Sequence, residues 1–287
     1  MKFKFGVASA FLLAALVVLG ASAGMAQDKA ATDKEATALA KATQNPVADL
    51  TTIPVQFNFF SGGDLGAQTL SQINVQPVMP LVINEKWNVI ARTIIPFVSI
   101  PLSSGERSSG IADIQEQLFF TPAKPGSIIW GIGPQLSLPT ATNTLLATGQ
   151  VALGPTAVVL GMPGNFVVGA LVNNVWRIAG DDQTTEINQF LFQPFINLNL
   201  ARGWALSTSP VITANWSAPS GEEWTVPIGL GISKVDRIGA RPVSLALQYY
   251  HLAEHPSGGA DDQWRFVFSL LYPKAKPPQP HQEAPKQ

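Results

Sequence analysis

The chain has 287 residues, of which 46% are hydrophobic and only 13% are charged, and its formal net charge is −1. A soluble domain usually carries about 25% charged residues, so this composition argues against a soluble globular protein. The near-zero charge without a basic patch argues against nucleic-acid binding, and the absence of cysteine excludes disulfides and cysteine-ligated metal sites.

Residues 1–26 have the pattern of a removable export signal. Two lysines precede an apolar core, Val7–Leu19, and small residues suited to cleavage follow at Ala21–Ala23 and at Ala26. The apolar core is short for a transmembrane helix, so a retained single-pass anchor is the less favoured alternative. The pattern predicts export through the periplasm of a Gram-negative cell.

Residues 27–50 form a leader ahead of the main domain. Within it, Asp28–Gln44 is rich in alanine and predicts a short helix. This helix could lie in the periplasm or enter the domain that follows. A loosely ordered leader is an equally weighted alternative.

Residues 51–273 alternate apolar residues with small or polar ones, and no segment in this range could cross a membrane as a helix. Asn188–Leu200 shows the pattern best, with Gln189, Gln193 and Asn197 on one parity and apolar residues on the other. Leu191 and Phe195 are exceptions. Successive strand side chains point to opposite faces, so one face suits hydrocarbon and the other water. Repeated around a closed sheet, this pattern predicts an all-β fold, a transmembrane antiparallel β-barrel of the outer membrane.

We predict about twelve strands, an even number that places both ends of the barrel in the periplasm. The predicted strands are residues 53–60, 69–83, 87–101, 112–122, 127–139, 150–161, 165–179, 186–200, 203–217, 224–234, 242–253 and 263–273. A soluble β-sandwich is the main alternative, but its surface would be more charged.

The predicted connections alternate between tight turns and longer, more acidic loops. The turns include Asn84–Lys86 and Asp236–Arg241, and the loops include Ser61–Gln68 and Glu254–Asp262. Because barrels have short periplasmic turns and longer outer loops, the acidic rim faces outward from the cell. Aromatic residues cluster at both sets of strand ends, as membrane interfaces favour: Trp87, Phe166, Trp204 and Tyr272 at one, and Phe60, Trp176, Trp216, Trp224 and Trp264 at the other.

The last predicted strand ends in an aromatic residue, Tyr272, and resembles the C-terminal strand that barrel assembly machinery reads. It departs from the usual pattern because the chain continues past it. Residues 274–287 contain proline and lysine and predict a disordered periplasmic tail.

Seven prolines fall inside predicted strands, where each removes a ladder hydrogen-bond donor. We favour bulges or local bends in the wall as the explanation. The alternative is a side window from the lumen to the lipid for an apolar solute. The residues are Pro77, Pro96, Pro134, Pro155, Pro194, Pro210 and Pro227.

Polar side chains on the inward parity predict the path of a solute through the lumen. Amides could bind neutral polar groups, while arginines could hold a carboxylate or a phenolate. Inward glycines such as Gly169 and Gly231 would leave space. The predicted lining residues are Arg92, Gln115, Gln117, Gln135, Asn173, Arg177, Gln189, Gln193, Asn197, Asn215 and Arg265.

Two questions about the lumen stay open on the sequence alone. A barrel of this strand number could be filled or plugged, or it could hold a permanent narrow pore. Glu116 falls on the lipid-facing parity, where a charge is costly, so we expect a bulge or register break there. Arg92 and Arg177 could also pair with this carboxylate or with nearby acids inside the barrel.

Six stretches of the chain carry a resemblance to a known family: Ala40–Leu50, Ala91–Pro96, Phe119–Gly126, Trp130–Thr142, Gly154–Asp182 and Trp224–Lys234. They resemble a bacterial outer-membrane family labelled as transporters or as phenol meta-pathway degradation proteins, some members of which carry the misleading label neuromedin U. The resemblance covers nearly the whole mature chain. It implies an outer-membrane barrel linked to uptake of aromatic or other hydrophobic compounds, and no catalytic residues.

The sequence thus predicts a non-enzymatic outer-membrane channel for small, hydrophobic or aromatic compounds, without a cofactor or metal. Its expected partners are membrane lipid, the assembly machinery and the solute; the oligomeric state is open. One alternative is a barrel lipase or deacylase, with a serine–histidine pair drawn from His251, His255, Ser217 and Ser257. Another is a structural barrel that conducts nothing.

Overall fold

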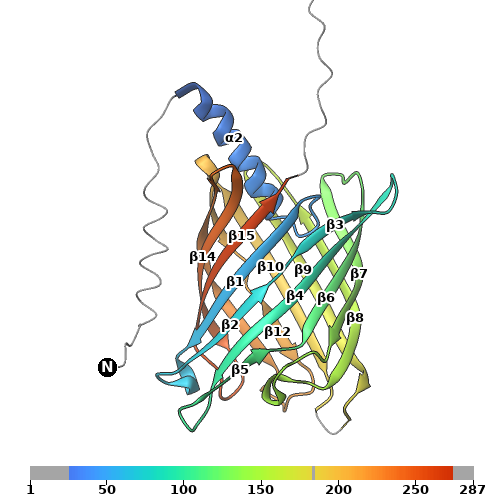
Figure 1. The fold of residues 1–287 in the computed structure, drawn as a ribbon, viewed down its shortest axis with the longest axis vertical. Coiled ribbons are helices and arrows are strands. Elements are labelled where there is room, and N and C mark those ends of the chain that lie inside the picture. The colour runs from blue at the N-terminus through green and yellow to red at the C-terminus, as the bar shows by residue number, and fades with distance from the viewer. Residues whose placement is uncertain (1–25, 183–184, 274–287) are drawn as a thin grey trace, which may run out of the picture.

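The computed structural model describes residues 26–182 and 185–273. The predicted tail, and all of the predicted export signal except Ala26, lie outside these residues. The described residues form a closed antiparallel β-barrel of 12 strands, preceded by one α-helix, α2 (Ala26–Thr43) (Figure 1). Among them, no helix has the length and hydropathy that crossing a bilayer requires.

Most strands cross the barrel without interruption, within a few residues of the predicted bounds. Three are interrupted, so the 12 strands appear as 15 segments. The interrupted strands are β2 (Thr69–Val75) with β3 (Val78–Val82), β5 (Arg107–Ile111) with β6 (Ile114–Pro122), and β11 (Trp204–Thr208) with β12 (Ile212–Asn215). The continuous strands are β1 (Thr51–Ser61), β4 (Trp87–Pro101), β7 (Ile128–Leu138), β8 (Gln150–Gly161), β9 (Phe166–Gly180), β10 (Asn188–Asn199), β13 (Trp224–Ile238), β14 (Arg241–Glu254) and β15 (Asp262–Tyr272).

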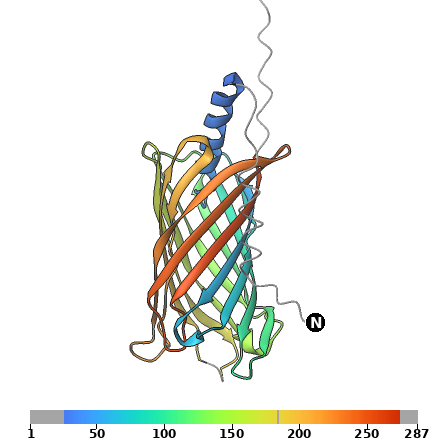
Figure 2. The same ribbon diagram turned by 90° about the vertical axis from the view of Figure 1, so that its left-hand side faces the viewer.

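Closure joins the first strand to the last. β1 pairs with β15 in unbroken antiparallel register from Thr51↔Tyr272 to Ser61↔Asp262. Every strand therefore has two neighbours and no edge is left unpaired, which a bilayer requires. Figure 2 shows the strands tilted against the barrel axis, with α2 at one end. We call this the helix end and the opposite one, with the longer connections, the loop end.

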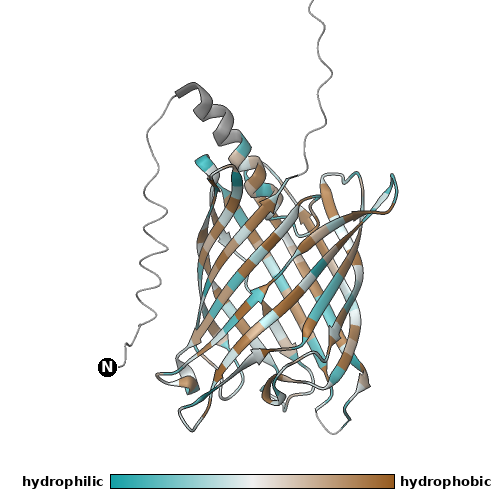
Figure 3. Cartoon of the chain, in the orientation of Figure 1, coloured by the Kyte–Doolittle hydropathy of each residue, from teal (hydrophilic) through white to brown (hydrophobic). Residues whose placement is uncertain are grey.

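The outer wall is apolar, as the alternation predicts. Large hydrophobic side chains such as Ile132, Leu230 and Ile232 are exposed on it, and Figure 3 shows hydrophobic residues recurring along the strands between polar ones. Aromatic residues lie near both rims. Trp216 packs edge-on against Trp224, with ring centroids 5.3 Å apart, and Trp87 packs edge-on against Trp130 at 5.9 Å. Exposed apolar surface between aromatic rims suits a surrounding bilayer.

The in-strand prolines coincide with most of the wall's irregularities. Pro77 and Pro210 lie in interruptions, and a register shift separates Val226 from Pro227. Pro134 lies opposite Pro155, inside continuous strands. Bends and bulges therefore account for Pro77, Pro210 and Pro227, while the side window remains a prediction.

Two sequence-based expectations about the wall are wrong. β13 continues to Ile238 and β14 begins at Arg241, so the turn predicted at residues 236–241 is reduced to 239–240, where Gly239 has φ +60°. This conformation costs glycine little and lets the two strands extend.

The second error concerns Glu116. β4 and β6 keep their register from Trp87↔Pro122 to Ile94↔Gln115, so no bulge turns this side chain inward. Glu116 faces outward, and its carboxylate accepts a hydrogen bond from the Thr93 hydroxyl (2.6 Å). The register changes farther along the strand, before Phe97↔Ile111. A neighbouring hydroxyl therefore partly satisfies the charge.

Candidate functional site: the barrel lumen

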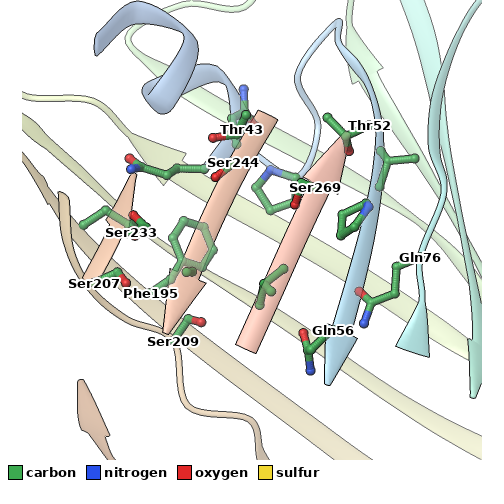
Figure 4. Close-up of a pocket in the computed structure, with 18 of the residues that line it drawn as sticks. Thr43, Thr52, Gln56, Gln76, Phe195, Ser207, Ser209, Ser233, Ser244 and Ser269 are labelled. Atoms are coloured by element: carbon green, nitrogen blue, oxygen red, sulfur yellow. The ribbon is translucent and has the colours of Figure 1, made fainter. Parts of the chain in front are cut away.

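The lumen at the helix end contains a cavity of about 250 Å³, which we call the helix-end chamber. Serine hydroxyls from three neighbouring strands line one side of it, at Ser233, Ser244 and Ser269 (Figure 4). Phe195 of β10 reaches into the same space. The chamber therefore has a hydroxyl-rich wall and an apolar one.

The segment Ala40–Leu50, which comprises the last turn of α2 and the residues after it, covers the chamber at the helix end. Ala40, Val47 and Leu50 are all buried. Gln44 and Asn199 of β10 exchange two amide hydrogen bonds, each 3.0 Å long. The predicted leader thus includes a helix, as expected, and its end is inserted into the mouth of the barrel. We call residues 40–50 the covering segment.

Val47 joins an apolar cluster inside the barrel that the sequence analysis did not predict. Its neighbours include Phe119, Leu171 and Phe195, and Leu191 packs against the edge of the cluster. Leu191 and Phe195 are the two exceptions in the β10 alternation, and this cluster explains them. The inner wall there is built for packing against the covering segment instead of for water.

Two arginines face the helix-end chamber. The Arg92 guanidinium donates to Gln76 Oε1 (2.7 Å) and Gln117 Oε1 (3.1 Å). Arg265 is 3% exposed and donates to Asn58 Oδ1 (3.2 Å) and to the Ser209 carbonyl (3.0 Å). Their protein partners are therefore neutral.

The Arg265 guanidinium also lies over the Tyr250 ring, 4.9 Å from its centroid. Tyr250 is fully buried, and its hydroxyl accepts a hydrogen bond from the Ser209 N–H (3.0 Å) in the interruption between β11 and β12. The cation and the backbone break are thus held by one aromatic side chain.

Each arginine has its own set of amide hydrogen bonds from neighbouring strands. Asn58 Oδ1 accepts hydrogen bonds from Gln56 (3.0 Å), Gln263 (2.9 Å) and Arg265. Gln117 donates to Gln135 Oε1 (2.7 Å) while accepting from Arg92. Such a network holds each side chain in one orientation.

A second cavity of about 390 Å³ lies toward the loop end, and we call it the loop-end chamber. It adjoins the first along the same strands. On β9, Leu171 lines the helix-end chamber and Asn173, the next inward residue, lines the loop-end chamber. On β10, Gln193 and Leu191 are divided in the same way. The two chambers therefore follow one another along the lumen.

The loop 255–261, between β14 and β15, is tied to two neighbouring loops. The Ser257 N–H (2.5 Å) and hydroxyl (2.7 Å) both donate to the Glu222 carboxylate. The Gly258 N–H donates to Asp64 (2.6 Å). The two bonds from Ser257 lower the pKa of Glu222 below its ordinary value, because they favour the ionised form.

His255 belongs to the same loop. Its Nδ1 lies 2.9 Å from the Pro256 carbonyl, and its Nε2 lies 3.3 Å from the Asp261 carboxylate. The Pro256 carbonyl, with a smaller contribution from Asp261, raises the pKa of His255 above its ordinary value, because both favour the protonated ring. Pro256 also lines the loop-end chamber, so this loop forms part of its boundary.

The predicted lining residues divide into distinct groups. Arg92, Gln193, Asn197 and Arg265 line the helix-end chamber, and Gln115, Gln135, Asn173, Gln189 and Asn215 line the loop-end chamber. Gln117 is buried between Arg92 and Gln135. Arg177 lines neither chamber. Of the two partners expected for it, Glu116 or a nearby acid, it pairs with a nearby acid, Glu186, near the loop end.

The inward glycines do not leave the space expected of them. A Cβ built on Gly169 would lie 2.4 Å from the Val159 carbonyl oxygen, and one on Gly231 would lie 2.2 Å from that of Leu247. Both positions serve the close approach of neighbouring strands, which only a residue without a Cβ permits. Beside Gly131, the space is occupied by Val47.

Neither His251 nor His255 forms the serine–histidine pair that a barrel hydrolase would need. His251 Nδ1 lies 3.2 Å from Asp262, and the Ser257 hydroxyl donates to a glutamate. Within residues 26–182 and 185–273, no hydrogen bond joins His251 or His255 to Ser217 or Ser257. Nor does this part of the chain gather histidines and carboxylates into a metal-binding group.

No protein-family model and no curated protein matches the chain. Among solved structures, an outer-membrane channel from Pseudomonas putida F1 is similar, with a TM-score of 0.59, 11% identity, and coverage of 78% of this chain and 96% of that one. The outer-membrane phospholipase A of Escherichia coli aligns with a TM-score of 0.43, 13% identity, and coverage of 81% of this chain and 98% of that one. The first likeness shows a shared outer-membrane barrel fold.

Proposed function

We propose that this chain is a channel of the Gram-negative outer membrane that passes small, hydrophobic or aromatic compounds without a cofactor. The apolar outer wall and the aromatic rims support membrane insertion. The resemblance to transporter-labelled outer-membrane proteins supports the solute class. On this proposal its partners are membrane lipid, the barrel assembly machinery and the solute.

The observation that carries the proposal is the pair of adjoining chambers inside the barrel. The loop-end chamber is the larger, and two of its lining residues, Gln189 and Asn215, are exposed. The helix-end chamber combines amide and hydroxyl groups with Phe195 and Leu171. A solute with an aromatic body and one polar group finds partners for both on this path.

The covering segment bounds the helix-end chamber, so passage of a solute requires this segment to move. It is held by packing at Val47 and by amide hydrogen bonds at Gln44, and it contributes no strand to the barrel ladder. Its displacement would leave the wall intact. The channel would then be a gated one.

The test is conductance in planar bilayers together with uptake of a small aromatic alcohol into liposomes. We expect brief, infrequent openings of the native chain and aromatic uptake above that of protein-free liposomes. Silence in both assays, for the native chain and for a variant whose covering segment is released, would contradict the proposal and favour a structural barrel. If the native chain hydrolysed phospholipid and His251→Ala did not, the result would instead favour an enzyme.

A further inference from the structure

We infer that the helix-end chamber is a binding site for a small carboxylate with an apolar body, of about the size of benzoate. This inference deepens the proposed channel function and rests on it for its biological role. It starts from the charges that face the chamber. Among the described residues that line it, Arg92 and Arg265 carry charge and no aspartate or glutamate is present.

An enclosed cation without a counter-ion is costly, since the protein interior solvates charge poorly. Arg265 is 3% exposed, and its partners are an amide oxygen, a carbonyl oxygen and the Tyr250 ring. Arg92 is bonded to two amide oxygens. An anion in the chamber would supply the compensating charge that these neutral groups do not.

The unused hydrogen-bond donors of the two arginines also point to an anion. A guanidinium has five N–H donors. The described protein groups accept two bonds from Arg92 and two from Arg265. The remaining N–H donors of each planar guanidinium group suit the two oxygens of a carboxylate.

The side of the chamber opposite the arginines is apolar and suits the apolar body of the ligand. In the ring of strands, β15 and β4 are separated by β1 and by the β2–β3 strand, while β10 lies across the barrel from them. Phe195 of β10 and Leu171 of β9 therefore face the chamber from the side opposite the arginines. An aromatic ring can pack there while its carboxylate meets the guanidinium groups.

The volume limits the size of the ligand. A cavity of about 150 Å³ is enough to bind benzene in an engineered protein. The helix-end chamber, at about 250 Å³, holds one ring with a carboxylate and leaves little room for a second ring. Inorganic phosphate would satisfy the arginines but would leave the apolar wall without a partner.

The test is isothermal titration of the full chain in detergent with benzoate, benzamide and inorganic phosphate. Benzamide has nearly the same shape as benzoate without its charge. Because hydrogen bonds to charged groups are the strong ones, we expect benzamide to bind about 10- to 100-fold more weakly. Phosphate, without an apolar body, is expected to bind more weakly than benzoate. Equal binding of benzoate and benzamide, or of benzoate and phosphate, would overturn the inference.

Substitutions locate the site. Arg92→Gln should weaken benzoate binding about 10- to 100-fold and leave benzamide unchanged. Arg241→Gln removes the same charge from the exposed helix-end rim, where Arg241 contacts Tyr272, and should alter binding less than twofold. Unchanged benzoate binding in Arg92→Gln would sink the inference. The comparison of ligands on the native chain needs no variant, so it decides the matter if Arg92→Gln fails to fold.

The proposed binding site and the proposed channel function can be contradicted independently of each other. Benzoate binding without conductance or uptake would support the site and contradict the channel. Conductance and uptake with no preference for benzoate over benzamide in binding would support the channel and contradict the site.

Discussion

Releasing the covering segment should open the channel, and the double variant Gln44→Ala/Val47→Ala is designed to do so. Val47 is buried in the apolar cluster, and Gln44 makes two hydrogen bonds to Asn199. Loss of two buried methyl groups costs about 1.6 kcal/mol at about 0.8 kcal/mol each, or about 2 kcal/mol with the cavity left behind. The two amide bonds contribute about 1 kcal/mol each.

The closed state should therefore lose about 4 kcal/mol relative to an open state in which these contacts are absent. Since about 1.4 kcal/mol corresponds to a factor of ten, the ratio of open to closed should rise about a thousandfold. Single-channel recording should show a native chain that is rarely open and a variant that is open for much of the record. Heat-modifiable migration on gels should be unchanged, because the strand ladder is untouched.

The matched control is Glu35→Gln. It also alters α2, but it removes an exposed ion pair with Arg237 (2.9 Å), and exposed pairs contribute about 0–1 kcal/mol. Its open probability should change less than about fivefold. A double variant that gates like the native chain would refute the reasoning, because the contacts of Gln44 and Val47 would then not hold the channel closed.

Three further predictions concern the wall and the loops. Gly169→Val should destabilise the barrel by about 1–3 kcal/mol or prevent its assembly, because its Cβ would overlap the neighbouring strand. The readout is a lower urea midpoint. The control Gly126→Ala, whose Cβ would have nothing within 4 Å, should leave the midpoint unchanged. The loop 255–261 should exchange its amide hydrogens most slowly at pH values between the lowered pKa of Glu222 and the raised pKa of His255. The Glu222 contacts are lost as the pH falls through its folded pKa, and those of His255 as the pH rises through its own, so exchange that is independent of pH after correction for intrinsic rates would contradict this assignment. Tyr250→Phe should cost about 1 kcal/mol of unfolding free energy, because a partly buried backbone N–H loses its acceptor. An unchanged urea midpoint would show that this bond contributes nothing.

The sequence was a good guide to the wall. Alternation located the strands because membrane insertion imposes the same rule along every strand, with most apolar residues toward lipid and most polar residues inward. Gln193 and Arg265 were placed inside by parity alone, and the structure puts both in the helix-end chamber. The interruptions at Pro77 and Pro210 also had a local cause, the missing N–H of proline.

Glu116 shows where local reasoning failed. Its parity was read correctly, but the expected bulge was not needed, since Thr93 on the neighbouring strand supplies a hydroxyl. The expectation that Gly169 and Gly231 leave space in the lumen was wrong for a similar reason. Whether a missing side chain leaves space depends on how closely the next strand approaches, and strand pairing sets that distance.

A period-two pattern constrains each residue independently of its distant neighbours, so the chain by itself determined the barrel, its strand count and the face that each strand turns inward. Closure of the barrel determined the contacts between distant residues inside it. It brought Phe195, Phe119 and the distant Val47 into one apolar cluster, seated the covering segment in the barrel mouth, and turned Arg92 and Arg265 toward one chamber. These are contacts between residues far apart in the chain, and their free energy depends on the three-dimensional arrangement of several strands at once.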